Sequence, residues 1–242
     1  MNKYILNFFV VSSIFVAKNL NAGQNIENFI GKCLKDGGVI FDIGANVGEK
    51  TTTYLKLGAK VICVEPQPSC VEVLFKKYGG NANVVIVDKA VGDKSGKMYM
   101  NICSSASTIS SLSSDWINKS RFCGKYKWDQ KIEVDVITLD ELIKQFGIPS
   151  FCKIDVENFE YEVIKGLSNK IKLLSFECNI EFFDNTIKCV NLLQKLGYKK
   201  FNIGFAREET FAFNKWQNVE QITKGLEAKK GTKAWGDVYA WF

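Results

Sequence analysis

Short apolar runs alternate with amphipathic segments along most of the chain, and this alternation limits the fold more than any other feature of the sequence. Residues 39–42, 60–65 and 84–88 are continuous apolar runs that each end in a carboxylate, and helix-like segments separate them. Similar runs return after residue 150. Continuous apolar strands that alternate with helices are typical of a parallel sheet covered on both faces. We therefore expect one α/β domain over residues 23–242, with about seven core strands.

Residues 97–130 interrupt this alternation, because they are rich in serine and aromatic residues and have weak periodicity. We expect a strand over 97–102, a long irregular segment, and a strand over 131–139. A helix should then begin at Thr138, with Glu141 completing a capping box. Long segments of this kind often form lids. Trp116 and Trp128 could contact a sugar from such a lid, or the segment could simply pack on the core.

The charged residues narrow the possible functions. The net charge is +6, but nearly all of the positive charge is lysine, and Arg121 and Arg207 are the only arginines. This scarcity disfavours a nucleic-acid reader, since arginine is the residue that best recognises phosphates and guanine. The chain contains no histidine, the usual general base and a common metal ligand. We therefore expect no metal site.

The eight cysteines do not form a C-x-x-C pair, which disfavours a zinc ribbon or a thioredoxin-like site. Cys63, Cys152 and Cys178 lie within apolar runs and should be reduced core residues. Cys103 and Cys123 lie in the irregular segment and could pair in an oxidising compartment.

Residues 1–22 form an apolar N-terminal segment with Lys3 before the apolar run and Ala22 at its end. This pattern is that of a secretory signal peptide. The alternative is a helix that packs on the domain or lies on a membrane surface. The run is shorter than the roughly 20 residues that span a bilayer.

The loop that follows the first strand carries a ligand-binding pattern. Gly44 and Gly48 are four residues apart, at the expected carboxyl end of a strand and the start of a helix. Glycine lets the backbone approach a ligand, and a helix N-terminus offers free N–H groups. The spacing differs from the G-x-G-x-x-G of dinucleotide enzymes.

The next two strands also end in carboxylates. Glu65 ends the second strand, where an acidic residue can accept hydrogen bonds from ribose hydroxyls. Asp88 ends the third strand and could accept one from an adenine amino group. Together the three strand ends predict an adenosyl ligand.

Four segments carry a resemblance to a known family: "FDIGANVGEKT", "VEPQP", "VDKAVGD" and "KIDVENFEYEVIKGL". They resemble the FkbM-type family of class I S-adenosylmethionine-dependent methyltransferases, and the likeness extends to the final "GDVYAWF". It implies a Rossmann-like, mostly parallel seven-stranded sheet with an antiparallel last strand and helices on both faces. It also implies methyl transfer from S-adenosylmethionine, usually to a hydroxyl of a sugar or secondary metabolite.

The resemblance assigns roles to individual residues. It implies that the methionine end of the cofactor lies against the first loop, that Glu65 holds the ribose, and that Asp88 lies by the adenine. The residues implied for the methionine end are Asp42, Gly44, Asn46 and Gly48. The chain has Asn158 where the family usually has glycine after "DVE", and asparagine tolerates the left-handed backbone that such a turn needs.

The fourth strand ends in "KIDVE", beside the cofactor loop in this topology. A hydroxyl acceptor must lose a proton, and without histidine a carboxylate or lysine must take it. Asp155 is the first candidate, with Glu157 and Lys153 as alternates. Glu177, at the end of the fifth strand, could bind or orient a sugar hydroxyl. Capping of the following helix is the alternative role of Asp155 and Glu157.

The leading hypothesis is an S-adenosylmethionine-dependent O-methyltransferase that acts on a sugar, glycan or glycolipid precursor. The alternatives are a nicotinamide-dependent oxidoreductase and a non-catalytic adenosylmethionine-binding module. We expect a cytoplasmic protein without a nucleic-acid partner, associated with a membrane surface if residues 1–22 form a surface helix. If they form a cleaved signal, the protein is exported. The sequence leaves the acceptor and the oligomeric state open.

Overall fold

The computed structural model describes residues 25–34, 38–206 and 208–242. Its main sheet has seven strands in the order β3-β2-β1-β7-β8-β10-β9. These strands are β1 Val39–Ile43, β2 Lys60–Val64, β3 Val84–Val87, β7 Phe151–Ile154, β8 Leu173–Asn179, β9 Lys200–Phe205 and β10 Trp235–Trp241. The number of core strands is the predicted one. Residues 1–22, for which a signal peptide or surface helix is expected, lie outside the described residues, so that expectation stays a prediction.

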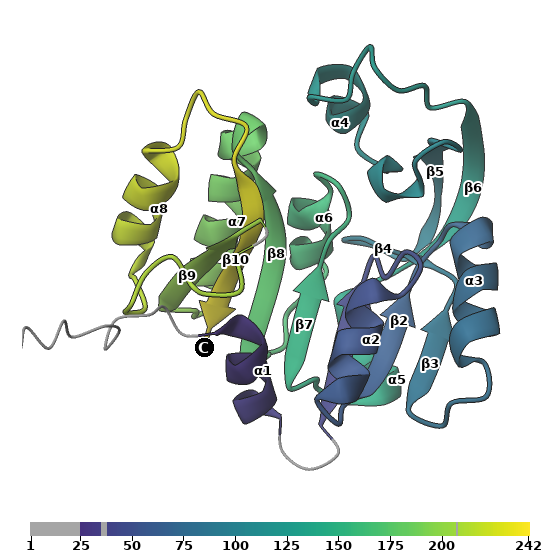
Figure 1. Ribbon diagram of the computed structural model, residues 1–242, viewed down its shortest axis with the longest axis horizontal. Coiled ribbons are helices and arrows are strands. Elements are labelled where there is room, and N and C mark those ends of the chain that lie inside the picture. The colour runs from purple at the N-terminus through teal and green to yellow at the C-terminus, as the bar shows by residue number, and fades with distance from the viewer. Residues whose placement is uncertain (1–24, 35–37, 207) are drawn as a thin grey trace, which may run out of the picture.

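The strand directions confirm the predicted sheet. β1 pairs in parallel with β2 and with β7, and β7 pairs in parallel with β8. β10 runs antiparallel to both β8 and β9, so the last strand is antiparallel as expected (Figure 1). The strand order reverses between β1 and β7. In open α/β sheets this position places the ligand site at the carboxyl ends of the two strands.

Helices cover both faces of the main sheet (Figure 1). α1 Ile26–Cys33, α2 Glu49–Lys56 and α3 Pro68–Tyr78 pack on one face, and α5 Leu139–Phe146, α6 Glu160–Lys165, α7 Phe183–Lys195 and α8 Val219–Glu227 pack on the other. β1 shows why helices are needed on both faces. Ile40 packs in the core beneath α1, α2 and α3, whereas Phe41 and Ile43 pack in the core beneath the helices of the opposite face. Among the described helices, none has both the length and the apolar content to cross a bilayer.

A second, three-stranded sheet stands beside the main one, in the order β4-β6-β5. It consists of β4 Ala90–Val91, β5 Gly96–Ile102 and β6 Gln130–Ile137. The strands expected over 97–102 and 131–139 therefore form, but they pair with each other rather than with the core sheet. The helix expected after β6 is α5, and its capping box between Thr138 and Glu141 is present as predicted.

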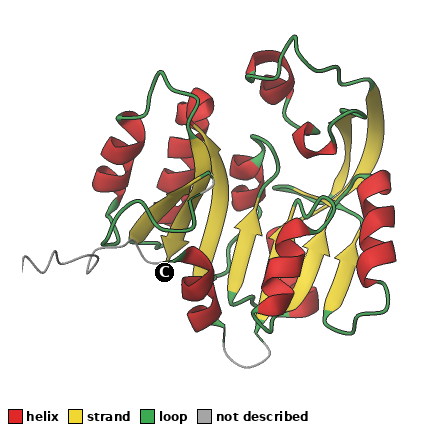
Figure 2. Cartoon of the chain, in the orientation of Figure 1, coloured by secondary structure: helices red, strands yellow, loops and turns green. Residues whose placement is uncertain are grey.

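The segment between β5 and β6, residues 103–129, is called the strap below. It contains a short 3₁₀ helix, η1 Ser107–Ile109, and a short helix, α4 Ser114–Lys119, and is otherwise loop (Figure 2). The strap has a small core of its own around Cys103, Ile109 and Trp116. Cys103 is buried and Cys123 is exposed, and both are free thiols, as are the other six cysteines.

Candidate active site

A cavity lies at the carboxyl ends of β1, β2 and β7, where the strand order reverses. Gly44 and Asn46 line it from the first loop, Glu65 from the end of β2, and Asp155 and Glu157 from the loop after β7. The strand topology thus brings five of the predicted site residues to one cavity.

Gly44 is required by the close approach of two loops. It has a positive φ of 78°, and a Cβ atom at this position would collide with the carbonyl oxygen of Asp155. A side chain here would therefore push the β1 loop away from the β7 loop. Glycine keeps both loops against the same cavity.

Gly48, which the resemblance places at the cofactor, lies where α2 approaches α3. It has φ 79° and precedes α2, but it is not among the residues that line the cavity. A Cβ atom here would lie 2.7 Å from Tyr78 Cε2 and 2.8 Å from Leu74 Cδ2, both on α3. Its glycine therefore lets α2 and α3 pack closely.

Glu65 is held by the backbone of the loops that surround it. The backbone amide of Asn46 donates to Glu65 Oε2 at 2.9 Å, and that of Gln67 donates to Glu65 Oε1 at 2.8 Å. The side chain is only 2% exposed. Burial raises the pKa of this carboxyl, and the two amide hydrogen bonds oppose the rise. The carboxyl is thus fixed in position at the cavity wall.

Two other predicted cofactor residues lie away from this cavity. Asp42 is buried beneath it and accepts a hydrogen bond from Thr51 Oγ1 at 2.7 Å, so it fastens α2 to β1. Asp88 is exposed and lines a separate groove with Pro68 and Phe75 of α3. The structure therefore does not bring Asp88 to the cavity that contains Glu65.

Lys153 is a buried cation rather than a free base. Its Nζ lies 2.6 Å from Asp155 Oδ2 and 3.5 Å from Asp237 Oδ1, and the residue is 4% exposed. Burial favours the neutral amine, but the charges of Asp155 and Asp237 outweigh it and raise the pKa of Lys153 well above its usual value. Lys153 therefore keeps its proton and orients Asp155.

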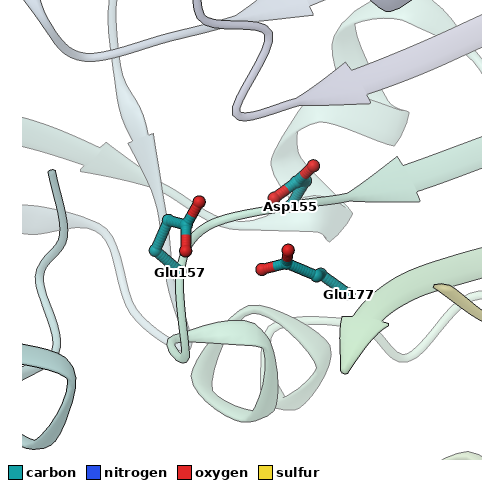
Figure 3. A group of neighbouring side chains, drawn as sticks. All are labelled: Asp155, Glu157 and Glu177. Carbon is teal, nitrogen blue, oxygen red and sulfur yellow. The ribbon is translucent and has the colours of Figure 1, made fainter. Parts of the chain in front are cut away.

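Three carboxylates converge at the ends of β7 and β8. One oxygen from each of Asp155, Glu157 and Glu177 lies within 4.8 Å of the others, and the three side chains point toward one another (Figure 3). Burial and the neighbouring carboxylates raise the pKa values of Glu157 and Glu177 well above the ordinary value. Such a cluster has the spacing to hold a cation, although exposed acidic groups are common without one.

The turn that carries Glu157 is clamped by a carboxylate that the sequence did not single out. Glu157 and Asn158 have φ values of 56° and 67°, so the asparagine does adopt the left-handed backbone that was expected. Glu160 Oε1 accepts hydrogen bonds from the backbone amides of Val156 at 3.2 Å and Asn158 at 3.1 Å. Glu160 is 3% exposed, and burial raises its pKa to about 7.

Comparison with known proteins decides the family. The model of the FkbM methyltransferase domain matches residues 42–200, which hold the cavity, the carboxylate cluster and the Glu160 clamp. The chain belongs to the FkbM methyltransferase family. The family and the mostly parallel seven-stranded sheet are therefore those that the sequence predicted.

The individual proteins that resemble this chain have low sequence identity to it. The hexuronic acid methyltransferase AglP of Haloferax volcanii is 25% identical over 168 residues, which are 69% of this chain and 65% of AglP. Among solved structures, a precorrin-6y C5,15-methyltransferase from Geobacter metallireducens has a TM-score of 0.47 and 14% identity, with 93% of each chain covered. An rRNA methylase from Streptococcus thermophilus has a TM-score of 0.43 and 11% identity, with 89% of this chain and 93% of that chain covered.

The cavity of this FkbM-family chain fits S-adenosylmethionine. Glu65 can accept hydrogen bonds from ribose hydroxyls, and Gly44 leaves the backbone open at the end nearest Asp155. Gln67, two positions after Glu65, also lines this cavity.

The strap of this family member closes one side of the cavity through its serines. Asn46 Nδ2 donates to Ser107 Oγ at 3.2 Å. Ser111 Oγ donates to the carbonyl oxygen of Glu157 at 2.7 Å. Asn158 Nδ2 donates to Ser113 Oγ at 3.2 Å, a contact that the glycine usual in the family could not make. The predicted lid is thus joined to both the cofactor loop and the carboxylate loop.

The two tryptophans predicted to contact the acceptor hold the strap together. Trp116 Nε1 and Trp128 Nε1 both donate to the carbonyl oxygen of Ile109, at 3.0 and 2.9 Å. Trp116 is 1% exposed and packs against Phe122 and Phe182. Neither tryptophan lines the cavity. Both indoles are therefore occupied within the strap's own core in this structure.

Arg121 fastens the far side of the strap. Its Nε lies 2.8 Å from Glu181 Oε2, and Glu181 belongs to the 3₁₀ helix η2 Ile180–Phe182 that follows β8. Its Nη1 donates to the carbonyl oxygen of Lys233 at 2.7 Å. One of the two arginines in the chain is thus used to anchor the strap beside the carboxylate cluster.

Proposed function

We propose that the protein transfers a methyl group to a hydroxyl of a sugar, in a free glycan or a glycolipid precursor. The observation that carries this proposal is the cluster of Asp155, Glu157 and Glu177 beside the cofactor cavity. Carboxylates accept hydrogen bonds from hydroxyls, and several of them together suit an acceptor with neighbouring hydroxyl groups. The similarity to AglP, whose name describes a hexuronic acid methyltransferase, supports a sugar acceptor.

S-adenosylmethionine, when bound, supplies a methyl group on an electrophilic sulfonium sulfur. The protein must orient the acceptor oxygen, remove its proton and exclude water. Gly44 allows the cofactor loop to lie against Asp155, which lines the same cavity as Glu157. The strap lines that side of the cavity with Ser107, Thr108 and Ser110.

Among the three predicted base candidates, Glu157 is best placed. Lys153 stays protonated, and Asp155 accepts the hydrogen bond from Lys153 Nζ. The Glu157 carboxylate accepts no hydrogen bond from the residues that the structure describes. Its raised pKa makes it a stronger base toward a hydroxyl than an ordinary carboxylate. Glu177, held by Asn179 Nδ2 at 3.1 Å, orients the acceptor.

The charge of the cluster also favours a hydroxyl over a carboxylate acceptor. A sugar carboxylate would bring a further negative charge next to carboxyl groups whose pKa values are already raised by burial and by one another. A hydroxyl is neutral and can donate its proton to them. This argument matters because a uronic acid offers both kinds of oxygen.

The test is methyl transfer from S-adenosylmethionine to a panel of hexoses, hexuronic acids and their glycosides. We expect a base-stable methyl ether as the product, and we expect Glu157→Gln to lower kcat by about 10²–10⁴-fold while S-adenosylmethionine affinity changes less than about twofold. A methyl ester, recognised by its loss in mild alkali, or full activity of the variant would contradict the proposal.

We further propose that the enzyme acts on the cytoplasmic side, where S-adenosylmethionine is made, and that residues 1–22 place it at a membrane surface near lipid-linked glycans. Fractionation of the full chain checks this: recovery with membranes supports it, and recovery of a shortened chain outside the cell contradicts it.

A further inference from the structure

Exposed lysines gather at the edge of the main sheet opposite the cavity, and this edge is called the basic edge below. β1, β2, β3, β7 and β8 begin there because they are parallel, and β9 begins there because β10 is antiparallel to both of its neighbours (Figure 1). The described segments of the basic edge that carry lysines are 56–60, 144–150, 168–172, 195–200 and 214–218. Their nine lysines, all exposed, are Lys56, Lys60, Lys144, Lys170, Lys172, Lys195, Lys199, Lys200 and Lys215.

The charge of the basic edge is not compensated. Its five segments contain no aspartate and no glutamate. None of their lysines forms an ion pair with another described residue, whereas lysines elsewhere, such as Lys76 and Lys97, lie 2.6 Å from a carboxylate. Soluble surfaces usually intersperse the two signs of charge. The basic edge can therefore attract an extended anionic partner.

Large apolar side chains are exposed among these lysines. Ile148 is 58% exposed, and Phe242, whose backbone amide donates to the Lys172 carbonyl oxygen, is 43% exposed. Lys170 Nζ lies 4.5 Å from the centre of the Phe242 ring, and Lys200 Nζ lies 5.4 Å from that of Trp241. Lysines and aromatic residues concentrate at the headgroups of a bilayer, because their apolar parts enter it while the charge stays in water.

A nucleic acid is the other extended polyanion that lysines could bind. The segments of the basic edge contain no arginine, the residue whose planar fork best recognises phosphates and base edges. An exposed isoleucine such as Ile148 has no use on a phosphate backbone, but it can insert between lipid headgroups. The combination of lysines with exposed apolar residues therefore favours a lipid surface.

We infer that the basic edge binds the surface of a bilayer that contains anionic phospholipids. Stable attachment to a membrane usually takes two signals, and the basic edge supplies the electrostatic one beside any apolar contribution of residues 1–22. β8 is seven residues long, so the cavity opens roughly 20 Å from the bilayer and away from it. The inference does not depend on the proposed methyl acceptor.

Cosedimentation of the full chain with vesicles tests the inference. The vesicles consist of phosphatidylcholine alone or of phosphatidylcholine with phosphatidylserine, and the readout is the ratio of the two partition coefficients. Binding to the neutral vesicles measures any contribution of residues 1–22, which cancels in the ratio. A lysine near an anionic surface strengthens binding by about fivefold, so the wild-type protein should prefer the anionic vesicles by at least about a hundredfold.

The first variant removes charge from the basic edge. Lys144→Gln, Lys172→Gln and Lys199→Gln are combined in one chain, and all three side chains are exposed, so the fold should be kept. The preference for anionic vesicles should fall by at least about tenfold.

The matched control removes the same charge from the other end of the strands. Lys119→Gln, Lys125→Gln and Lys127→Gln are combined in the strap, where all three lysines are exposed. The two variants have equal net charge, but at about 0.1 M salt the Debye length is about 10 Å, so the strap is screened from the bilayer. The control should keep the wild-type preference within about twofold.

Three outcomes would overturn the inference: equal binding of both kinds of vesicle by the wild-type protein, an unchanged preference in the basic-edge variant, or the same loss in both variants. If the wild-type protein shows no lipid preference but binds poly(U) RNA, and only the basic-edge variant loses that binding, the partner is a nucleic acid and the inference is wrong.

Discussion

At the scale of single residues, the site depends on carboxyl groups whose surroundings differ. Glu65 is held by two backbone amides, Asp155 by Lys153, and Glu160 by the amides of the loop that it clamps. Glu157, between them, accepts no hydrogen bond from the described part of the chain. The fixed groups position the loops, and we propose that the free one takes the proton of the acceptor.

Glu160 gives a pH prediction. Burial raises the pKa of its carboxyl from 4.5 to about 7, so between these values the folded protein binds a proton that the unfolded chain has released. Its contribution to the free energy of unfolding is therefore complete below about pH 4.5 and is lost as the pH rises through about 7. Glu160→Gln, which keeps an acceptor for both amides, should not show this loss.

Urea denaturation at about pH 5 and about pH 8 checks this prediction. At each pH, the free energy of unfolding of the wild-type protein is subtracted from that of Glu160→Gln. This difference should increase by on the order of 1–3 kcal/mol from the lower pH to the higher one. A difference that stays constant with pH would contradict the assignment of the raised pKa to Glu160.

Sequence patterns predicted the position of the site better than its detailed contacts. A carboxylate at a strand end indicates which edge of the sheet it occupies, and this placed Glu65, Asp155 and Glu157 at the cavity. The side to which a strand-end side chain turns is set by its packing, and Asp88 lines a groove other than the one that contains Glu65. Glu160 escaped notice because a glutamate in a helix has many ordinary roles.

At the scale of elements, the strap is the part of the fold that the sequence predicted least. Its serines suggested an irregular lid. The hydrogen bonds that join the strap to the site could not be predicted, because each is a single contact between segments far apart in the sequence. The strands on either side were foreseen as strands, but the alternation of β6 does not specify its partner, and β4 has only two residues. The separate sheet was therefore not predicted.

Arg121 should control the mobility of the strap. Arg121→Lys keeps the charge but removes the planar fork that joins Glu181 and the Lys233 carbonyl. We expect backbone amides of residues 103–129 to exchange with deuterium at least about tenfold faster, while those of the main sheet stay protected.

Lys119→Ala is the matched control for this experiment. Lys119 is in the same strap, but its ion pair with Asp115 is more than half exposed and should contribute little. Unchanged exchange of the strap in Arg121→Lys, or equal acceleration in Lys119→Ala, would show that Arg121 is not the anchor.

At the scale of the whole molecule, the fold could be predicted because the apolar runs and the amphipathic segments between them indicate the same α/β arrangement. Continuous apolar strands require helices on both faces, and the two cores that flank β1 provide them. The reversal of strand order between β1 and β7 then fixes where a ligand can bind. The second sheet and the strap line one side of the cavity but do not change its position at the strand ends.

The central claim is that this cavity binds S-adenosylmethionine through Glu65, and calorimetric titration of the full chain tests it most directly. We predict saturable one-to-one binding by the wild-type protein, weakened at least about tenfold in Glu65→Gln because a charge-assisted pair of hydrogen bonds to the ribose is lost. The control Glu72→Gln, on the exposed side of α3, should bind like the wild-type protein. Absence of binding by folded wild-type protein, or unchanged affinity in Glu65→Gln, would contradict the account.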